Sequence, residues 1–556
     1  MSLRPQTDLA VPDLTARVAR AAFPKGNAYL TARDGLGTLF HDDDFADLYS
    51  DTGQPASAPW RLALVTVFQF AENLTDRQAA DAVRARLDWK YALSLDLEDA
   101  GFDFSVLSEF RGRLLDGGAE ERLLGRMLDL FKERGLVKAR GRQRTDSTHV
   151  LAAVRELNRL ELVGETMLHA LNALAEAAPE WLRRMAPPEW PDRYRARFTG
   201  FHLPRAKAKR EVLSDAVGAD GWHLLGLVYD DAAPEHLRRV SAVETLRRVW
   251  LQQYQYARDD SGGGRLRWRK SGNLPPAALM VSSPYDTEAR HSSKRGGHWR
   301  GYKVHLTEAC DDDGLLAILN VETTVATDQD WASVEPVHCH LGEKGLLPAE
   351  HFVDSAYTSA DLLADSRTRH GVDLVGPIRP NRSWQMDDDD SYDVSHFALD
   401  WDREVATCPQ GHESRYWKPA KRVKDRGTIP MVQVHFHPRD CAACPARPLC
   451  TRKRAGPREL TLHVRDHHEA MVAARERQET GAFWGRYSVR AGVEGAVSQG
   501  VRTSGMRRSR YRGMAKTHLQ HVATAAAMNL KRAVDWLDGV PRSRSYQSPF
   551  SALMAA

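Results

Sequence analysis

Apolar runs separated by short polar turns predict that residues 1–135 are helical. Residues 60–70 are apolar enough for a buried helix, and Thr75 and Gln78 have the spacing of a capping box at the start of the next helix. A further helix is expected over residues 119–134, where a glycine follows the last apolar position. The chain therefore opens with several short helices.

Beyond this region the pattern changes from helix to strand. A β-patterned run leads into Asp146, and further strands are expected at residues 301–307 and 315–325. Residues 154–251 return largely to a helical pattern, and another short β-patterned run ends at Asp354. This alternation predicts an α/β core with a helical segment inserted into it.

Three of the 74 acidic residues stand out by their context: Asp146 and Asp354, at the ends of β-patterned runs, and Glu494, inside a helical run. A fold that brings them to one edge of a sheet would let them hold two Mg²⁺ or Mn²⁺ ions, because hard cations take oxygen ligands. Two such ions about 3.5–4 Å apart are what phosphodiester cleavage or transfer requires. The three acids are therefore candidate metal ligands and catalytic residues.

The surroundings of Glu494 make this interpretation more specific. Tyr487, Arg490 and Glu494 follow one another at offsets of three and seven, which fall on one face of an α-helix. This Y-x2-R-x3-E spacing resembles the signature of the DDE transposases of bacterial insertion sequences, in the IS-four and IS-five supergroup and closest to the IS-eleven-eighty-two group. The family usually has Lys seven residues after the Glu, whereas this chain has Val501 there and Arg502 next.

Other segments carry the resemblance along most of the chain, in the family's order. Residues 146–149 (Asp-Ser-Thr-His) are similar to the first-aspartate segment, residues 299–305 to a core strand, and residues 353–357 to the second-aspartate strand. Residues 508–518 and 525–531 resemble the closing helices. The resemblance implies a ribonuclease H-like core of the retroviral-integrase type.

The resemblance also implies a function. It predicts a transposase that binds the terminal inverted repeats of its own element, cuts the DNA there, and joins the ends to target DNA as a homodimer or larger assembly. Tyr487 and Arg490 would grip the DNA backbone, with Arg502 in place of the missing Lys. A ribonuclease H-like nuclease without strand transfer and a domesticated, non-catalytic DNA-binding protein remain as alternatives.

The predicted domain organisation follows from these segments. The helical region 1–135 would bind DNA or form a dimer, with a plain helical bundle as the other interpretation, and the catalytic core would comprise residues 136–380 and 460–535. Residues 152–275 would form a mainly helical insertion within the core. Two further segments complete the chain: a Cys-rich insertion at 381–459 and a flexible tail at 536–556.

The Cys-rich segment holds four of the six cysteines: Cys408, Cys441, Cys444 and Cys450. Such clustering in a cytoplasmic protein favours zinc over disulfides, and four thiolates would complete a tetrahedral structural site. His412 is an alternative ligand for one of them, and free thiols are the alternative to zinc. The two remaining cysteines, Cys310 and Cys339, are isolated and are expected in the core.

The distribution of charge along the chain indicates which kind of molecule the protein binds. The formal net charge is only +4, but residues 481–533 carry ten Lys and Arg against the single acid Glu494. A basic field around one carboxylate suits a site that holds DNA phosphates near a metal. The candidate DNA contacts in this stretch, besides Tyr487 and Arg490, are Arg502, Arg507, Arg508, Arg510, Arg512 and Lys516.

Membrane association is not expected. No apolar run approaches the 18 or more residues that span a bilayer, and the first residues lack a signal-peptide pattern. We therefore expect a cytoplasmic, nucleoid-associated bacterial protein.

Overall fold

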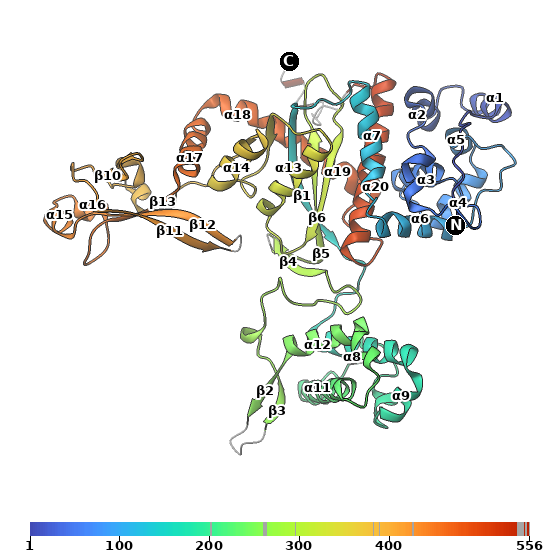
Figure 1. The fold of residues 1–556 in the computed structure, drawn as a ribbon, viewed down its shortest axis with the longest axis horizontal. Coiled ribbons are helices and arrows are strands. Elements are labelled where there is room, and N and C mark those ends of the chain that lie inside the picture. The colour runs from blue at the N-terminus through green and yellow to red at the C-terminus, as the bar shows by residue number, and fades with distance from the viewer. Residues whose placement is uncertain are drawn as a thin grey trace.

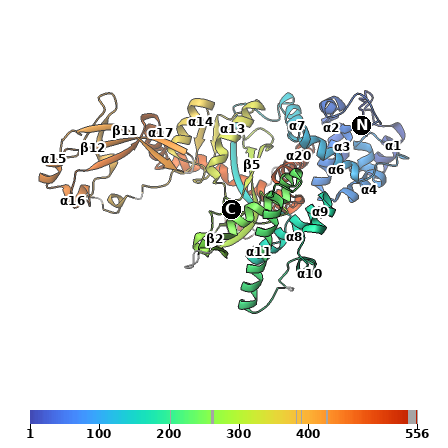
Figure 2. The ribbon, with the colours of Figure 1, turned by 60° about the horizontal axis from the view of Figure 1, so that its bottom comes forward.

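A computed structural model gives the fold of the chain (Figure 1). It describes residues 1–200, 203–258, 264–294, 296–381, 383–388, 390–424, 427–541, 550 and 553–554. Three bodies surround a central sheet: the N-terminal helices on one side, a Cys-containing sheet on the opposite side, and a helical body below (Figure 1). Figure 2, after a turn of the molecule, again shows the N-terminal helices and the Cys-containing sheet at opposite ends.

The N-terminal region is helical, as predicted. The capping box at Thr75 and Gln78 is present, with each side chain accepting from the other residue's backbone N–H. The helix predicted over 119–134 is α7, and Gly135 follows it with φ +66°. The helices are α1 (Asp13–Ala22), α2 (Ala28–Leu36), η1 (Asp42–Leu48), α3 (Pro59–Ala71), α4 (Asp76–Ala85), α5 (Leu87–Ala92), α6 (Ser105–Asp116) and α7 (Arg122–Glu133).

The central sheet runs β6-β5-β1-β7-β8, with β4 also paired to β5. β1 is antiparallel to β5 and parallel to β7, which is parallel to β8. The strands are β1 (Arg142–Leu151), β4 (Arg290–Lys294), β5 (Gly297–Ala309), β6 (Ile318–Val325), β7 (Glu350–Phe352) and β8 (Asp373–Val375). Three antiparallel strands followed by two parallel ones, with the first strand central, are consistent with a ribonuclease H-like core.

One detail of the strand prediction was wrong. Asp146 does not end its strand: β1 continues five residues further, to Leu151, because its second half still pairs with β5. Asp354 does follow its strand, two residues after the end of β7.

The apolar core is shared between the N-terminal helices and the sheet. Helix α20 (Met514–Leu537) lies between them and contacts β6, α3 and α7. One cluster of buried residues joins Trp60 in α3, Val304 in β5 and Ala525 in α20. The N-terminal region therefore packs on the sheet through α20 rather than around a separate core.

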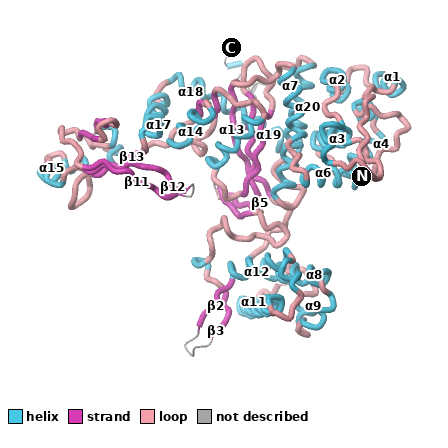
Figure 3. Tube along the Cα trace, in the orientation of Figure 1, coloured by secondary structure: helices cyan, strands magenta, loops and turns pink. Residues whose placement is uncertain are grey.

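The segment between β1 and β4 forms a helical body with its own core. Its cluster of buried residues includes Val163, Leu224 and Trp250. A two-stranded hairpin follows the helices (Figure 3). The elements are α8 (Arg159–Ala177), α9 (Pro179–Met185), α10 (Trp190–Arg193), α11 (Lys207–Tyr229), η2 (Glu235–Arg239), α12 (Ser241–Gln253), β2 (Tyr254–Arg258), β3 (Gly264–Trp268) and η3 (Ser271–Asn273).

Shorter helices contact β6 and β8 of the sheet. These are α13 (Val334–Glu343) and α14 (Ala360–His370), and η4 (Asp330–Ser333) directly precedes α13. Helices η5 (Trp384–Asp387) and η6 (Val394–His396) lead from this region to the next body. Among the described helices, none is long and apolar enough to cross a membrane.

Residues 398–463 form a small body here named the Cys lobe. A three-stranded sheet, β11-β12-β13, packs on a two-stranded one, β10-β9, around a core that includes Val432, Val434 and Leu460. The elements are β9 (Ala398–Asp400), β10 (Val405–Thr407), β11 (Tyr416–Lys424), β12 (Gly427–His435), α15 (Pro438–Ala443), α16 (Arg447–Cys450) and β13 (Glu459–His463).

The chain then returns to the central sheet through α17 (Arg465–Gln478), α18 (Gly481–Tyr487), η7 (Ser488–Ala491) and α19 (Gly492–Ser504). Helix α19 contacts β1 and β5, which brings the late segment against the first strand of the core. The predicted flexible tail lies mostly outside the described residues, since α20 ends at Leu537 and the description stops at 541, 550 and 553–554.

Candidate active site and Cys cluster

Asp146 occupies the middle of the sheet. It pairs through the backbone with Leu306 of β5, and its Oδ1 accepts a hydrogen bond of 2.8 Å from the Ser147 N–H. Burial raises the pKa of this carboxyl above its usual value, and the positive charge of Arg490 opposes that rise. A positive charge beside Asp146 therefore favours its ionised form.

Asp354 and Glu494 reach the same place from other elements. Asp354 follows β7, the strand parallel to β1, and its Oδ1 accepts from the Ala356 N–H at 2.7 Å. Glu494 is the third residue of α19, and its side chain is 66 % exposed. Each of the three predicted acids therefore comes from a different part of the chain.

Arg490 joins the three acids. Its Nη2 lies 2.7 Å from Asp146 Oδ2 and 4.0 Å from Asp354 Oδ2, and its Nη1 lies 3.2 Å from Glu494 Oε1. Burial alone would lower the pKa of Arg490, but the three carboxylates and Tyr487 outweigh it and raise the pKa. We call Asp146, Asp354 and Glu494 the acidic triad.

The donor chemistry of the triad suits a hard divalent cation. Three carboxylates surround one positive charge, which the Arg490 guanidinium supplies in this structure. Within the described residues, the three carboxylates are not all within 4.8 Å of one another. To hold a metal together they would have to draw closer, with Arg490 moving aside.

A buried ion network fixes the position of η7 against β1. Arg144 pairs with Glu308 of β5 at 2.6 Å and donates to the Val489 carbonyl at 2.6 Å, and Arg532 of α20 holds the other oxygen of Glu308 at 2.7 Å. A Cβ at Gly492 would overlap the Arg144 guanidinium, so a larger residue there would displace Arg144 from Glu308 and the Val489 carbonyl. The sequence interpretation missed this network, although Arg144 lies two residues before Asp146 and hence on the same face of the strand.

Tyr487 braces the segment that carries Asp354. Its hydroxyl donates to the Val353 carbonyl at 3.1 Å, and its ring stacks on Phe483 with centroids 5.6 Å apart. Burial raises the pKa of Tyr487 to about 12. The single helix expected through Tyr487, Arg490 and Glu494 is broken by the 3₁₀ turn η7, yet Arg490 and Glu494 still pair at i,i+4.

The residue at the family's Lys position faces inward. Val501 is partly buried and packs against the main core, whereas Arg502 is exposed. The Arg502 Nε donates to the Ser498 carbonyl of the same helix at 3.5 Å, and its role in place of the missing Lys stays a prediction.

The other basic candidates divide into two groups. Arg507, Arg508, Arg512 and Lys516 are exposed, and Arg507 donates to Thr148 Oγ1 of β1 at 2.9 Å, close to the triad's strand. Arg510 instead donates to the Leu74 carbonyl at 2.6 Å and to Asn73 Oδ1 at 2.5 Å. The Arg510 guanidinium therefore links the C-terminal segment to the N-terminal helices, and its predicted contact with DNA stays untested.

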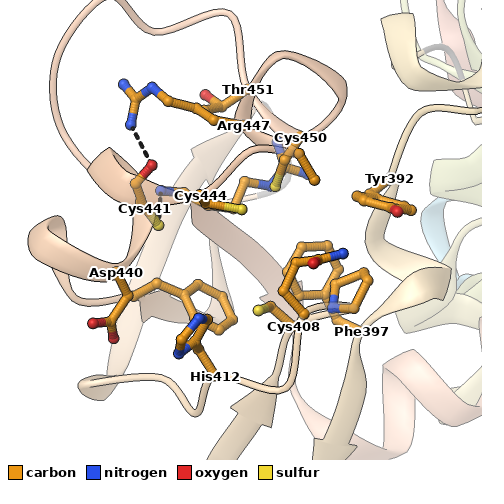
Figure 4. Close-up of a pocket in the computed structure, with 15 residues that line it drawn as sticks. Tyr392, Phe397, Cys408, His412, Asp440, Cys441, Cys444, Arg447, Cys450 and Thr451 are labelled. Atoms are coloured by element: carbon orange, nitrogen blue, oxygen red, sulfur yellow. Dashed lines mark hydrogen bonds between the residues drawn. The ribbon is translucent and has the colours of Figure 1, made fainter.

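The four clustered cysteines line one cavity in the Cys lobe (Figure 4). Cys408 follows β10, Cys441 lies in α15, Cys444 caps that helix, and Cys450 ends α16. His412 lies at the same cavity (Figure 4).

The turn after β10 explains how Cys408 reaches the cavity. The Gly411 N–H donates to the Cys408 carbonyl at 2.9 Å, and Gly411 has φ +82°, a conformation that favours glycine. Burial raises the pKa of the Cys450 thiol, and the three other cysteines raise it further. Zinc would reverse this, because it binds the thiolate form.

The cysteine set fits zinc in its donors. Within the described residues, three of its sulfurs do not come within 4.8 Å of one another, so the cavity would contract around an ion. The prediction that both remaining cysteines are core residues was half wrong: Cys310 is buried, but Cys339 is exposed on α13.

The sheet order and the acidic triad together indicate a class of protein. A ribonuclease H-like sheet order with carboxylates from β1, the end of β7 and a late helix is consistent with a DDE enzyme that acts on DNA. Two segments of the chain match transposase families: residues 407–534 match "Transposase DDE domain" and residues 18–113 match "Transposase domain (DUF772)". These matches support an insertion-sequence transposase.

The extent of the first match is informative. It begins directly before Cys408 and ends in α20, so it contains Glu494 and all four clustered cysteines but neither aspartate. The Cys lobe and the closing helices are thus matched as one unit. No curated protein matches the chain.

Proposed function

We propose that this protein is a DNA transposase that binds the terminal inverted repeats of its insertion sequence, cuts the DNA at the ends and joins them to target DNA. The observation that carries the proposal is the meeting of Asp146, Asp354 and Glu494 around Arg490. The order of these acids along the chain and the two transposase matches support it.

The acidic triad would hold Mg²⁺ or Mn²⁺. Such ions supply Lewis acidity for phosphoryl transfer and lower the pKa of a bound water. Asp146 would be the most constrained ligand, because strand pairing on β1 fixes its backbone. Glu494 would be the most mobile, since its side chain is 66 % exposed.

Arg490 would have two functions. Without metal, its guanidinium balances the carboxylates and prevents their mutual repulsion. With DNA bound, the same group would turn to a phosphate oxygen, which accepts charge-assisted hydrogen bonds from guanidinium. Tyr487 would hold the backbone next to Asp354 in place through its hydrogen bond to the Val353 carbonyl.

DNA binding would use the exposed cations beside the triad. Arg507 lies against β1 at Thr148, so a duplex on this surface would approach Asp146 directly. The remaining candidates are Arg502, Arg508, Arg512 and Lys516. Pairing of two element ends would require a homodimer or larger assembly.

The Cys lobe would hold one structural Zn²⁺ through Cys408, Cys441, Cys444 and Cys450, with His412 as the alternative to one thiolate. Its main apolar cluster is small, with seven buried residues in the described part of the chain, so a metal would contribute much of its stability.

The decisive experiment uses duplex DNA carrying the inverted repeats that flank the gene. Wild-type protein with Mg²⁺ should release the ends and form joined target products. Glu494→Gln should reduce cleavage at least about 10²-fold, the cost typical of losing one group that stabilises transition-state charge. Binding of the same DNA should persist, because Glu494 carries no positive charge.

Glu476→Gln, an exposed acid on α17, is the matched control and should cleave as wild type does. Cleavage retained in Glu494→Gln would overturn the triad. Cleavage without any joined product would favour the alternative, a ribonuclease H-like nuclease. Binding without cleavage in the wild type would favour a domesticated DNA-binding protein.

A further inference from the structure

A third group of side chains with metal-ligand atoms lies on α13 and α14. Glu335 and Cys339 belong to α13, and His370 is the last residue of α14. Their ligand atoms all lie within 4.8 Å of one another, and no other set of His, Cys, Asp or Glu in the described part of the chain does so. Neither the acidic triad nor the Cys lobe contributes a residue.

Helix geometry brings these donors together. Glu335 and Cys339 are four residues apart, so they lie on one face of α13. Helix α14 contacts α13, and His370 Nε2 lies 3.1 Å from Glu335 Oε2. The Cys339 thiol donates to the other oxygen of Glu335 at 3.9 Å.

The His370 ring packs against another, buried histidine ring. Its side chain is only 14 % exposed, and its ring centroid lies 5.3 Å from that of His338, which is fully buried. The Nδ1 of His338 is buried without a hydrogen-bond partner among the described residues. Its Nε2 lies 2.9 Å from His351 Nδ1.

This row of rings continues to the active-site strand. His351 Nε2 lies 2.6 Å from Thr145 Oγ1, and Thr145 directly precedes Asp146 on β1. The surface group is therefore joined to the central strand by buried side chains, through His338 and His351.

The donor set indicates which ion fits. One thiolate, one imidazole and one carboxylate are ligands of Zn²⁺, which takes three protein ligands and a water in an open site. Mg²⁺ and Ca²⁺ prefer oxygen ligands alone. Arg369 carries a positive charge that would repel the ion. Its Nη1 lies 3.6 Å from Glu335 Oε1, but its side chain is 61 % exposed and can turn to solvent.

We propose that Glu335, Cys339 and His370 bind one Zn²⁺, with water as the fourth ligand and release of the Cys339 proton to solvent. The ion would fasten the end of α14 to α13. Since α14 begins six residues after Asp354, it would also stiffen the segment that carries this acid. The site stands independently of the proposed transposase activity.

The test counts zinc on the full chain after loading and dialysis against metal-free buffer. Cys339→Ser should hold one equivalent less than wild type, whether or not the Cys lobe holds another. Glu476→Gln, an exposed acid on α17, is the control and should keep the wild-type content. Equal zinc in wild type and Cys339→Ser would overturn the proposal.

A second variant and a second readout guard against misfolding. His370→Gln should also lose one equivalent, and thermal unfolding of each variant without zinc should match that of the metal-free wild type. Added Zn²⁺ should raise the Tm of the wild type more than that of either variant. If Cys339→Ser unfolds, His370→Gln decides, and its retention of full zinc content would reject the site.

Discussion

The acidic triad and the cysteine cluster are built in opposite ways. Asp146, Asp354 and Glu494 come from a central strand, a strand end and a late helix, and the shared core behind them includes the N-terminal helices. The four cysteines fall within residues 408–450 and line a cavity in one small lobe. The first site depends on the whole tertiary structure, whereas the second depends on a few local turns.

This difference in construction predicts which mutations disrupt each site. A change in the core should disturb the triad through the network of Arg144, Glu308 and Arg532 and leave the lobe folded. A change in the cysteine cavity should unfold the lobe and leave the central sheet intact.

The largest expected effect tests the lobe. Cys441→Ser should lose the lobe's zinc and make residues 398–463 sensitive to protease, because structural zinc contributes on the order of 10 kcal/mol in small domains. Zinc content and limited proteolysis measure this. Ala442→Ser, an exposed neighbour on the same helix, is the control and should resist protease.

A Cys441→Ser lobe as resistant to protease as the wild type would show that its apolar core suffices without metal.

His412→Ala distinguishes the two possible ligand sets. This variant should keep the zinc if four thiolates bind it, and lose the zinc if His412 replaces one of them.

A smaller effect tests the core under the triad. Burial lowers the pKa of His521 on α20 to about 3, and the ring contacts Thr323 Oγ1 at 2.8 Å. Because the unfolded state takes up this proton below pH 6.5, the unfolding free energy should fall as pH falls from about 6.5 toward 3. His521 alone should contribute about 2 kcal/mol of this loss at pH 5.

Urea unfolding at pH 7.5 and pH 5 measures this effect. In His521→Gln the difference between the two pH values should be smaller by that amount. An unchanged difference would mean that His521 is not buried neutral in solution.

The smallest effect concerns the brace at Asp354. Tyr487→Phe removes the hydroxyl that donates to the Val353 carbonyl, which should cost about 1 kcal/mol of stability. Cleavage should fall by no more than about 10-fold, well short of the Glu494→Gln loss. Tyr416→Phe, exposed on β11, should leave both quantities unchanged.

Local features were read correctly from the sequence because they depend on near neighbours. The capping box at Thr75 and Gln78 needs only three residues of spacing, and the turn at Gly135 needs only a backbone conformation. The i,i+4 pair of Arg490 and Glu494 is local as well. The four clustered cysteines do line one cavity, whereas the zinc predicted from their clustering stays a prediction.

Other features could not be read in this way. The 3₁₀ turn η7 interrupts the expected helix where Arg144 reaches the Val489 carbonyl, a contact between residues far apart in sequence. The exposure of Cys339 depends on which face of α13 turns outward, and the surroundings of Val501 on which face of α19 meets the core.

By itself, the sequence determined the kinds of element, the order of the three acids and the donors available to metals, because periodicity and spacing are properties of the chain. Only the tertiary structure decided that Arg490 stands between the three acids, that Arg510 links to the N-terminal helices, and that Glu335, Cys339 and His370 meet. Those contacts join segments that are far apart in the sequence, and the packing of the core determines which segments meet.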